Sequence, residues 1–381
     1  MKPIRQRKFA LVMISGACFT AALGGKSASN NDAEEATSMM SSYDAEQRAA
    51  AAAREKDASW KPSCSEVGLI QIGDSKRPGA LKNFCLNAEG NILACFARDE
   101  AGVYFDPAIR IYSPKGQLLK ALPLKIKPEA ICLAKDGSIF VAGDGRVLKL
   151  DAAGKVLASA DSPTAKEAVT INKETEEMVK QMATQERRPV TEVMARMKTN
   201  LEKRRAEVTG LAVTDQDVFM AAPSPSDFTF RVYRFDHALQ NPKLVVEKLR
   251  GCCGQMDIQA HDGQLWIPHN ARHAVEIHDR DGKQLSKFGK AGRVKATDFG
   301  GCCEPKNLRV LSNGDILAAE SGPPTCIKRF SASGDFKEVV AVAKNSKGDC
   351  VRVTVEMSPD GRQYYMLDTT RDAIRVFVRK S

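Results

Sequence analysis

The chain of 381 residues is poor in aromatic side chains and in histidine, with two Trp, six Tyr, 15 Phe and five His. Its 57 basic residues outnumber its 47 acidic residues, but they form no dense block and do not alternate with aromatic residues. A nucleic-acid-binding surface normally needs a concentrated basic patch or stripe. We therefore expect no nucleic acid among the partners of this protein.

Several short motifs of catalysis and ligand binding are missing as well. The sequence has no Gly-x-Ser-x-Gly nucleophile elbow, no glycine-rich phosphate loop, no Cys-x-x-Cys pair and no paired-carboxylate motif. The common hydrolase and nucleotide-binding signatures are thus absent. The sequence leaves the substrate or ligand open.

The N-terminus has the pattern of a secretory signal peptide. Residues 9–23 are mostly apolar but shorter than the ~20 residues that a membrane-spanning helix needs. A basic start precedes them and small residues follow. We expect residues 1–25 to be removed on export to the periplasm or the exterior. The formal net charge of +10 then becomes +6, and no integral membrane span is left.

Residues 26–59 are rich in Ala, Ser, Asp, Glu and Met. They carry too little apolar surface to offset the entropy of ordering, so we expect a disordered tether, with 44–56 as its most helix-prone part. We expect the folded domain to cover residues 60–381.

A glycine repeat organises that domain. Gly90, Gly137, Gly263, Gly314 and Gly361 each lie in a polar turn between two short apolar runs. With a glycine-less copy at residues 215–217, the unit occurs six times. A repeat of about 40–50 residues built from short strands is typical of propeller blades. The fold class expected is all-β, a closed six-bladed β-propeller.

The sixth unit predicts how the ring closes. It begins with an expected strand at 351–355 and ends after three strands, whereas an unassigned strand, residues 67–72, precedes the first unit. Pairing of this N-terminal strand with the last blade would close the ring and cover both exposed edges.

Residues 163–207 interrupt the repeat between the second and third blades. Apolar residues recur there at helical spacing on both sides of Arg188 and Pro189. We expect a helical insertion made of two helices, packed against each other or on the rim.

The segments 305–320 and 262–267 resemble NHL-repeat proteins, and the resemblance extends over residues 67–378. More distantly, the chain is similar to lactonase-like propellers. The resemblance implies a scaffold that hosts binding proteins, lyases and metal-dependent hydrolases, so it implies little about activity. It also implies that two sets of loops share one face around the central channel. These are the loops that join successive blades and the loops between second and third strands.

Two Gly-Cys-Cys runs, at 251–253 and 301–303, hold equivalent positions before neighbouring blades on that face. Removal of Cys18 with the signal leaves ten cysteines, an even number that export would allow to form disulfides. Bridges within or between the two pairs are one interpretation. A soft-metal site at Cys252, Cys253, Cys302 and Cys303, with a histidine, is the second, and free or redox-active thiols are the third. A further pairing of Cys64 with Cys350 is a guess from the proposed closing strand.

The same face gathers further candidate ligand-binding residues. Besides the four cysteines these are Glu304, His269, Asn270, Arg272, His273, Glu129, Glu320 and Arg98. The resemblance to lactonase-like propellers implies a divalent cation held by acidic and amide residues such as Glu129, Glu304, Glu207 and Asn307, although the ligand motifs of that family are not matched.

We expect a non-catalytic binding module that holds a protein, peptide or glycan on its cysteine-bearing face. The alternative is a metal-dependent or thiol-based enzyme, a hydrolase, lyase or redox protein, with its site at the mouth of the channel. No cofactor is predicted beyond a possible divalent or soft metal ion, and the oligomeric state is not predicted.

Overall fold

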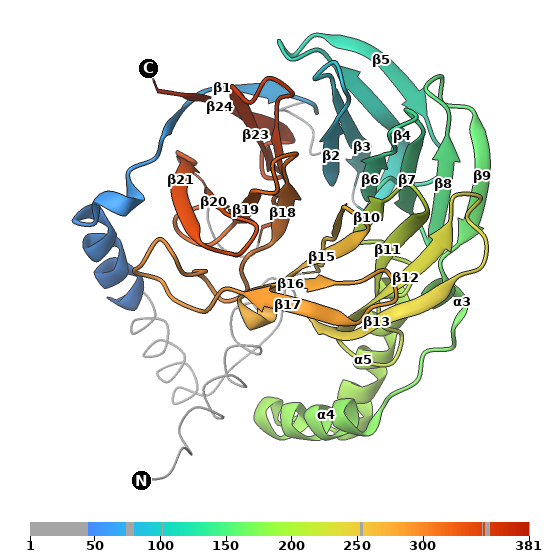
Figure 1. Cartoon of the computed structure of the whole chain (residues 1–381). Coiled ribbons are helices and arrows are strands. Elements are labelled where there is room, and N and C mark those ends of the chain that lie inside the picture. Colours follow the sequence, from blue (N-terminus) through green and yellow to red (C-terminus); the bar gives the residue numbers. More distant parts are fainter. Residues whose placement is uncertain are drawn as a thin grey trace.

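The structure, a computed structural model, describes residues 45–73, 80–100, 102–251, 254–344, 346 and 351–380. Six antiparallel sheets of four strands stand around a common centre (Figure 1). The first strand of each sheet contacts the first strands of both neighbouring sheets, and the contact between β22 (Val355–Met357) and β2 (Asn83–Leu86) completes the ring. The prediction of a closed six-bladed propeller is confirmed.

Blades one to three follow the chain order from the innermost to the outermost strand. Their other strands are β3 (Ile92–Glu100), β4 (Val103–Tyr112), β5 (Leu118–Pro123), β6 (Ala130–Leu133), β7 (Ile139–Gly143), β8 (Arg146–Leu150), β9 (Val156–Asp161), β10 (Gly210–Val213), β11 (Asp217–Pro223), β12 (Thr229–Asp236) and β13 (Lys243–Arg250).

Blades four and five repeat this order, whereas in blade six β1 is the outermost strand. Their other strands are β14 (Gln259–His261), β15 (Gln264–His269), β16 (Ala274–His278), β17 (Gln284–Phe288), β18 (Asn307–Val310), β19 (Ile316–Glu320), β20 (Cys326–Phe330), β21 (Phe336–Val342), β23 (Gln363–Asp368), β24 (Ala373–Arg379) and β1 (Cys64–Gln71).

The glycine repeat marks the turn between the first and second strands of five blades. All five glycines have φ between 71° and 81°. Residues with a Cβ rarely adopt this left-handed backbone conformation, so glycine is the residue that allows the chain to turn from one strand into the next. The third blade replaces this turn with a hydrogen bond from the Asp217 N–H to the Thr214 hydroxyl oxygen at 2.9 Å.

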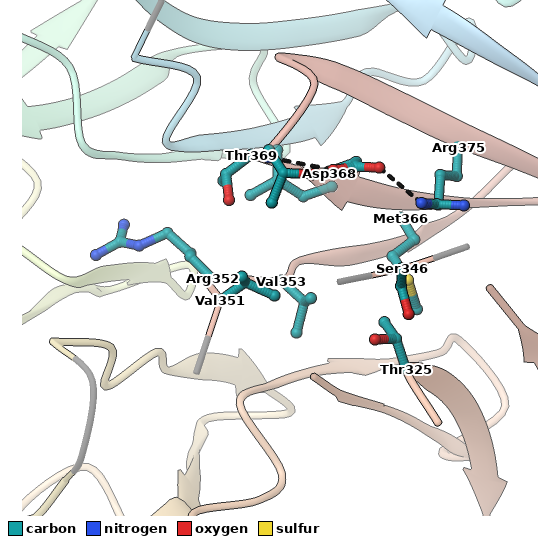
Figure 2. A pocket seen from close by; sticks show the side chains of 11 residues that line it. Thr325, Ser346, Val351, Arg352, Val353, Met366, Asp368, Thr369 and Arg375 are labelled. Carbon is teal, nitrogen blue, oxygen red and sulfur yellow. Dashed lines mark hydrogen bonds and ion pairs between the residues drawn. The ribbon is translucent and has the colours of Figure 1, made fainter. Parts of the chain in front are cut away.

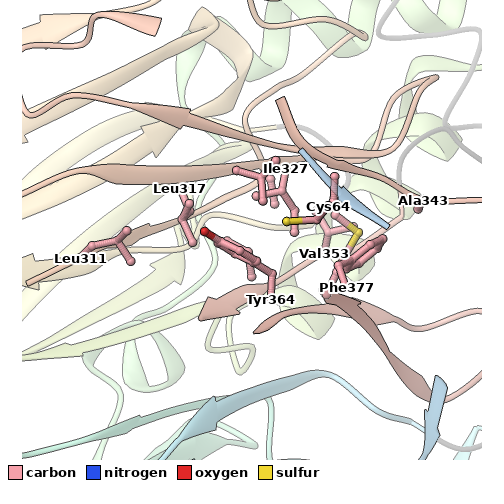
Figure 3. Packing of buried hydrophobic residues seen from close by; sticks show 13 residues of the cluster. Cys64, Leu311, Leu317, Ile327, Ala343, Val353, Tyr364 and Phe377 are labelled. Atoms are coloured by element: carbon pink, nitrogen blue, oxygen red, sulfur yellow. The ribbon is translucent and has the colours of Figure 1, made fainter. Parts of the chain in front are cut away.

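The N-terminal strand closes the last blade, as predicted. β1 pairs antiparallel with β24, from Cys64 opposite Arg379 to Gln71 opposite Ala373. Figure 3 shows Cys64 packed beside Phe377 and Val353 in the core between blades five and six. Burial of this apolar surface joins the two ends of the propeller domain.

Two strand boundaries differ from those expected. The first strand of blade six begins at Val355 rather than at 351, because Val353 donates its N–H to the Gln255 side chain at 3.2 Å and accepts from it at 2.8 Å. Side-chain bonds thus replace the strand ladder in this segment. In blade one, the sequence pattern predicts strands at residues 92–96 and 108–112, whereas β3 continues to Glu100 and β4 begins at Val103, so the two form a projecting hairpin.

The insertion is helical, as predicted. It contains α3 (Pro163–Lys166), α4 (Lys173–Glu186) and α5 (Val190–Arg204), and the break between α4 and α5 is at Arg187, Arg188 and Pro189. Val179 and Ala183 of α4 pack on Val193 and Met197 of α5. Figure 1 shows this hairpin beside blade three, outside the ring of sheets.

The segment before β1 has an ordered part. Residues 45–55 are helical, and a short 3-10 helix, η1 (Ala58–Trp60), follows. The Arg54 guanidinium donates to the Arg293 carbonyl oxygen at 2.6 Å, and the Trp60 indole donates to that of Val294 at 2.6 Å. The predicted tether therefore contacts the loop before blade five through its C-terminal part. The predicted signal peptide, residues 1–25, lies outside the described residues.

Within the part of the chain that the structure describes, no helix has both the length and the apolar character needed to cross a membrane.

Candidate functional site

The loops between blades and those between second and third strands meet at one end of the channel, here called the channel mouth. Arg352, in the loop before β22, crosses this mouth. Its guanidinium donates to the carbonyl oxygens of Glu129 in blade two, at 3.1 Å, and of Gly254 in the loop before blade four, at 3.3 Å. A residue of blade six thus bonds to two other blades across the centre.

Lys82 lies close enough to both Arg352 and Lys127 to be repelled by them. Lys82 precedes β2 and Lys127 lies in the loop before β6. The Lys127 ammonium is 2.9 Å from Glu129 Oε1, but Lys82 makes no side-chain hydrogen bond or ion pair with any described residue. Partial burial, and then the charges of Arg352 and Lys127, lower the pKa of Lys82. Among the described residues, this half-buried ammonium group therefore has no counter-ion in contact with it.

The acidic residues at the mouth are engaged elsewhere. Glu129 receives the Val208 N–H at 3.0 Å in addition to Lys127. Burial raises the pKa of Glu207, although Arg204 opposes this shift. A carboxyl group that resists ionisation neutralises little positive charge.

Below these charges, polar side chains link four successive blades. Asn307 Nδ2 donates to Asp257 Oδ2, Asn307 Oδ1 accepts from the Val355 N–H at 2.8 Å, and the Thr354 hydroxyl donates to Asn83 at 3.0 Å. Burial raises the pKa of Asp257 to about 6, whereas the Ile258 N–H, Arg309 and Arg352 act against this shift. The amide and carboxylate groups of this belt bond to one another.

A small pocket adjoins the mouth on its blade-six side (Figure 2). Its wall includes the hydroxyl groups of Thr325, Thr369 and Thr370 and the apolar side chains of Val351 and Val353. The remaining lining residues are Ser346, Arg352, Met366, Leu367, Asp368 and Arg375. Figure 2 shows Arg352 pointing away from the ion pair between Asp368 and Arg375, which is 2.8 Å long.

The predicted ligand residue His269 has a structural role. Its Nε2 accepts the Arg250 N–H at 2.9 Å, and its Nδ1 lies 2.9 Å from Glu276 Oε1. His278 contacts the other oxygen of Glu276. Burial alone would raise the pKa of Glu276, but the hydrogen bonds from both histidines outweigh it and hold that pKa well below its usual range. His269 therefore joins β13, β15 and β16 rather than facing a ligand.

Three more predicted residues also bond within the protein. Asn270 donates to the Gln255 carbonyl oxygen at 2.7 Å. Arg272 Nη1 is 3.7 Å from Glu276. Arg98 pairs with Glu100 and Asp106 on the projecting hairpin of blade one.

Around the loop before blade five, the structure brings together four predicted residues and one that was not predicted, Lys306. We call this group the Cys302 cluster, and it consists of Cys302, Cys303, Glu304, Lys306 and His273. The sulfur atoms of Cys302 and Cys303 are 3.1 Å apart, and Lys306 Nζ donates to Cys303 Sγ at 2.8 Å. Cys302 is exposed, whereas Cys303 and Lys306 are each 1% exposed. The pair thus has one accessible and one buried sulfur.

Glu304 shapes the loop that carries these sulfurs. Its Oε1 accepts the N–H groups of Ser321 and Gly322, at 2.9 and 2.8 Å. Gly301 has φ +65°, and a Cβ there would lie 3.1 Å from the Glu304 side chain. Glycine is therefore required at this position of the Gly-Cys-Cys run. Burial raises the pKa of Glu304 well above its usual value, against the effect of Lys306.

Two neighbours complete the surroundings of the cluster. Burial lowers the pKa of His273, while Cys303, Cys302 and Glu320 act in the opposite direction. Glu320 accepts the Gly300 N–H at 2.6 Å and pairs with Lys328 at 2.5 Å. Glu304 and Glu320 thus both hold the loop in place by accepting hydrogen bonds from backbone N–H groups.

No disulfide joins any two cysteines in the described ranges. Cys252, Cys253 and Cys350 lie outside these ranges, so the bridges proposed for them remain predictions. Burial raises the pKa of Cys132 to about 12, and it also raises the pKa values of Cys85, Cys95 and Cys326, so these thiols are inert strand residues. Among the described residues, no group of three or more His, Cys, Asp or Glu side chains is placed to hold a metal ion.

Sequence reasoning missed Lys82, Lys127, Arg352, Asp257 and Lys306. A signal was present for two of them, because Lys82 and Lys306 directly precede the first strands of their blades, as Glu129 does. That position faces the channel mouth in a propeller.

No protein-family profile and no curated protein sequence matches the chain. Among solved structures, a Bacteroides thetaiotaomicron protein of unknown function aligns with a TM-score of 0.53 and 13% identity, over 83% of this chain and 76% of that one. A Xanthomonas campestris gluconolactonase aligns with a TM-score of 0.48 and 10% identity, over 85% and 98%. The WD40 domain of Neurospora crassa Pan2 aligns with a TM-score of 0.45 and 9% identity, over 84% and 98%. None of these comparisons assigns the chain to the NHL-repeat family, and at such identities the likeness concerns the six-bladed propeller fold alone.

Proposed function

We propose that this protein is a non-catalytic binding module that recognises a carboxylate-bearing peptide or glycan at the channel mouth. The observation that carries the proposal is the Lys82 ammonium, half-buried beside Arg352 and Lys127 and without a partner among the described residues. Desolvating a charge without pairing it is costly, so such a group favours an anion from outside.

Arg352 connects this cationic group with the neighbouring pocket, which it also lines. A ligand bound at Lys82 that extends past Arg352 would reach the pocket lined by Thr325, Thr369 and Thr370. Polar groups on loops held by a rigid ring suit recognition, because the frame fixes their spacing.

The experiment is calorimetric titration of the protein with two probes, an oligoglutamate peptide and an oligogalacturonate. We expect one of them to bind, more weakly as salt rises, and Lys82→Met to weaken that binding by about tenfold or more, since a hydrogen bond to a charged group contributes about 1.5–3 kcal/mol. The probe that binds identifies the source of the carboxylate.

Lys155→Met is the matched control, because Lys155 is an exposed lysine in the turn between β8 and β9, at the opposite ends of the strands. It should leave the affinity unchanged. Absence of binding by both probes, or equal effects of the two substitutions, would contradict the proposal.

A further inference from the structure

The Cys302 cluster is chemically distinct from the carboxylate site and shares no residue with it. Cys302 and Cys303 are adjacent in the chain with their sulfur atoms 3.1 Å apart, in contact but farther apart than the ~2.05 Å of a disulfide bond. Oxidation would join them in an eight-membered ring without any large movement of the loop.

The two sulfurs have different environments. Cys302 is exposed and can meet a substrate, whereas Cys303 is buried and accepts a hydrogen bond from Lys306. An ammonium group at 2.8 Å from a sulfur stabilises the thiolate, which is the form that attacks a disulfide. Cys302 is thus the sulfur that a substrate can reach, and Cys303 is the sulfur whose thiolate is stabilised.

We propose that Cys302 and Cys303 form a redox-active vicinal dithiol that exchanges with disulfides and dithiols of partner molecules. In the reducing direction, Cys302 loses its proton to water and attacks a substrate disulfide, which forms a mixed disulfide and expels one substrate thiolate. The Cys303 thiolate, its proton likewise lost to water, then attacks the sulfur of Cys302 and expels the second substrate thiolate. Both substrate thiolates take up protons from water, so two electrons and, through water, two protons pass from the dithiol to the substrate. In the reverse direction, the vicinal disulfide oxidises a substrate dithiol and is itself reduced.

The structure also indicates which direction is favoured. The ring of a vicinal disulfide is strained, and the bond to Lys306 stabilises the reduced form. Both effects make the disulfide a better oxidant than an ordinary structural bridge. The partner class is therefore a molecule that carries a dithiol, and a small-molecule disulfide such as oxidised glutathione regenerates the centre.

The test is equilibration of the full chain in buffers of reduced and oxidised glutathione, followed by alkylation and peptide mass mapping. We expect a reversible disulfide between Cys302 and Cys303. Lys306→Met should raise the equilibrium constant for disulfide formation about tenfold, the change that corresponds to one unit in thiol acidity. Lys155→Met, which removes an exposed lysine in the turn between β8 and β9, should leave it unchanged.

Cys302→Ser replaces an exposed side chain, so it tests the assignment without risk to the fold. It should abolish both the disulfide and the exchange with oxidised glutathione while the circular dichroism spectrum stays unchanged. The proposal is overturned if no Cys302–Cys303 disulfide forms at any glutathione ratio, if Cys302 pairs with a different cysteine, or if the two lysine substitutions act alike.

Discussion

The carboxyl group of Asp257 should make the folding stability of the protein depend on pH. Burial raises its pKa to about 6, so the unfolded chain gives up this proton at lower pH than the folded chain does. A raised folded-state pKa contributes stability below the unfolded value, near pH 4. That contribution is lost as the pH rises through 6.

We expect Asp257→Asn to remove this loss of folding stability at high pH, because asparagine does not ionise. Relative to the wild type, the variant should gain about 3 kcal/mol in free energy of unfolding between pH 4 and pH 8, measured by urea denaturation at each pH. Asp315→Asn is the opposite control. Hydrogen bonds from Lys337 and Arg329 lower the pKa of Asp315 despite its burial, so that variant should lose stability above pH 4. A flat difference between Asp257→Asn and the wild type would contradict the assignment.

At the scale of elements, the helical insertion has a core of its own. Val179 and Ala183 of α4 meet Val193 and Met197 of α5, and Phe228 of blade three packs against the same group. This small apolar cluster holds the two helices together, and Phe228 connects it to blade three. The hairpin can therefore differ in stability from the ring of blades.

Met197→Ala should destabilise this hairpin by about 2–3 kcal/mol through the cavity that it leaves. We expect faster hydrogen exchange of the α4 and α5 amides and unchanged exchange in the blades, measured by mass spectrometry. Lys198→Ala, an exposed neighbour, serves as the control and should change neither. Faster exchange throughout the sheets would show that hairpin and ring unfold together.

The sequence predicted elements better than contacts. The closing strand was predictable because the sixth unit lacked a strand and an apolar segment upstream had no other partner. The start of β22 was not, since it depends on bonds from Gln255, about 100 residues earlier. His269 looked like a ligand because its burial and its partner Glu276 cannot be read from residue type. Lys306 was missed because its residue type does not separate it from the many other lysines, and its contact with Cys303 appears only in the structure.

For the whole molecule, stability depends on the joint between the two ends of the domain. β1 covers the outer edge of β24, which would otherwise present unpaired N–H and C=O groups. The ring closes at this sheet, so the other blades depend on it as well.

A chain that starts at residue 64 should remain folded and should not aggregate, because it keeps β1. A chain that starts at residue 73 loses that strand. We expect it to aggregate and to unfold at a temperature at least about 10 °C lower, since a few kcal/mol shift the midpoint by this amount. Scanning calorimetry and light scattering make the comparison. Equal behaviour of the two chains would show that β1 does not hold the ring.

The register of this closing pair also determines how the molecule responds to pulling. Cys64, at the start of β1, lies opposite Arg379, at the end of β24, so both ends of the folded domain leave from the same end of the strand pair. A force applied to the two termini would load the hydrogen bonds one after another, as in opening a zipper, rather than all together in shear. Under tension, the propeller would therefore open first between β1 and β24.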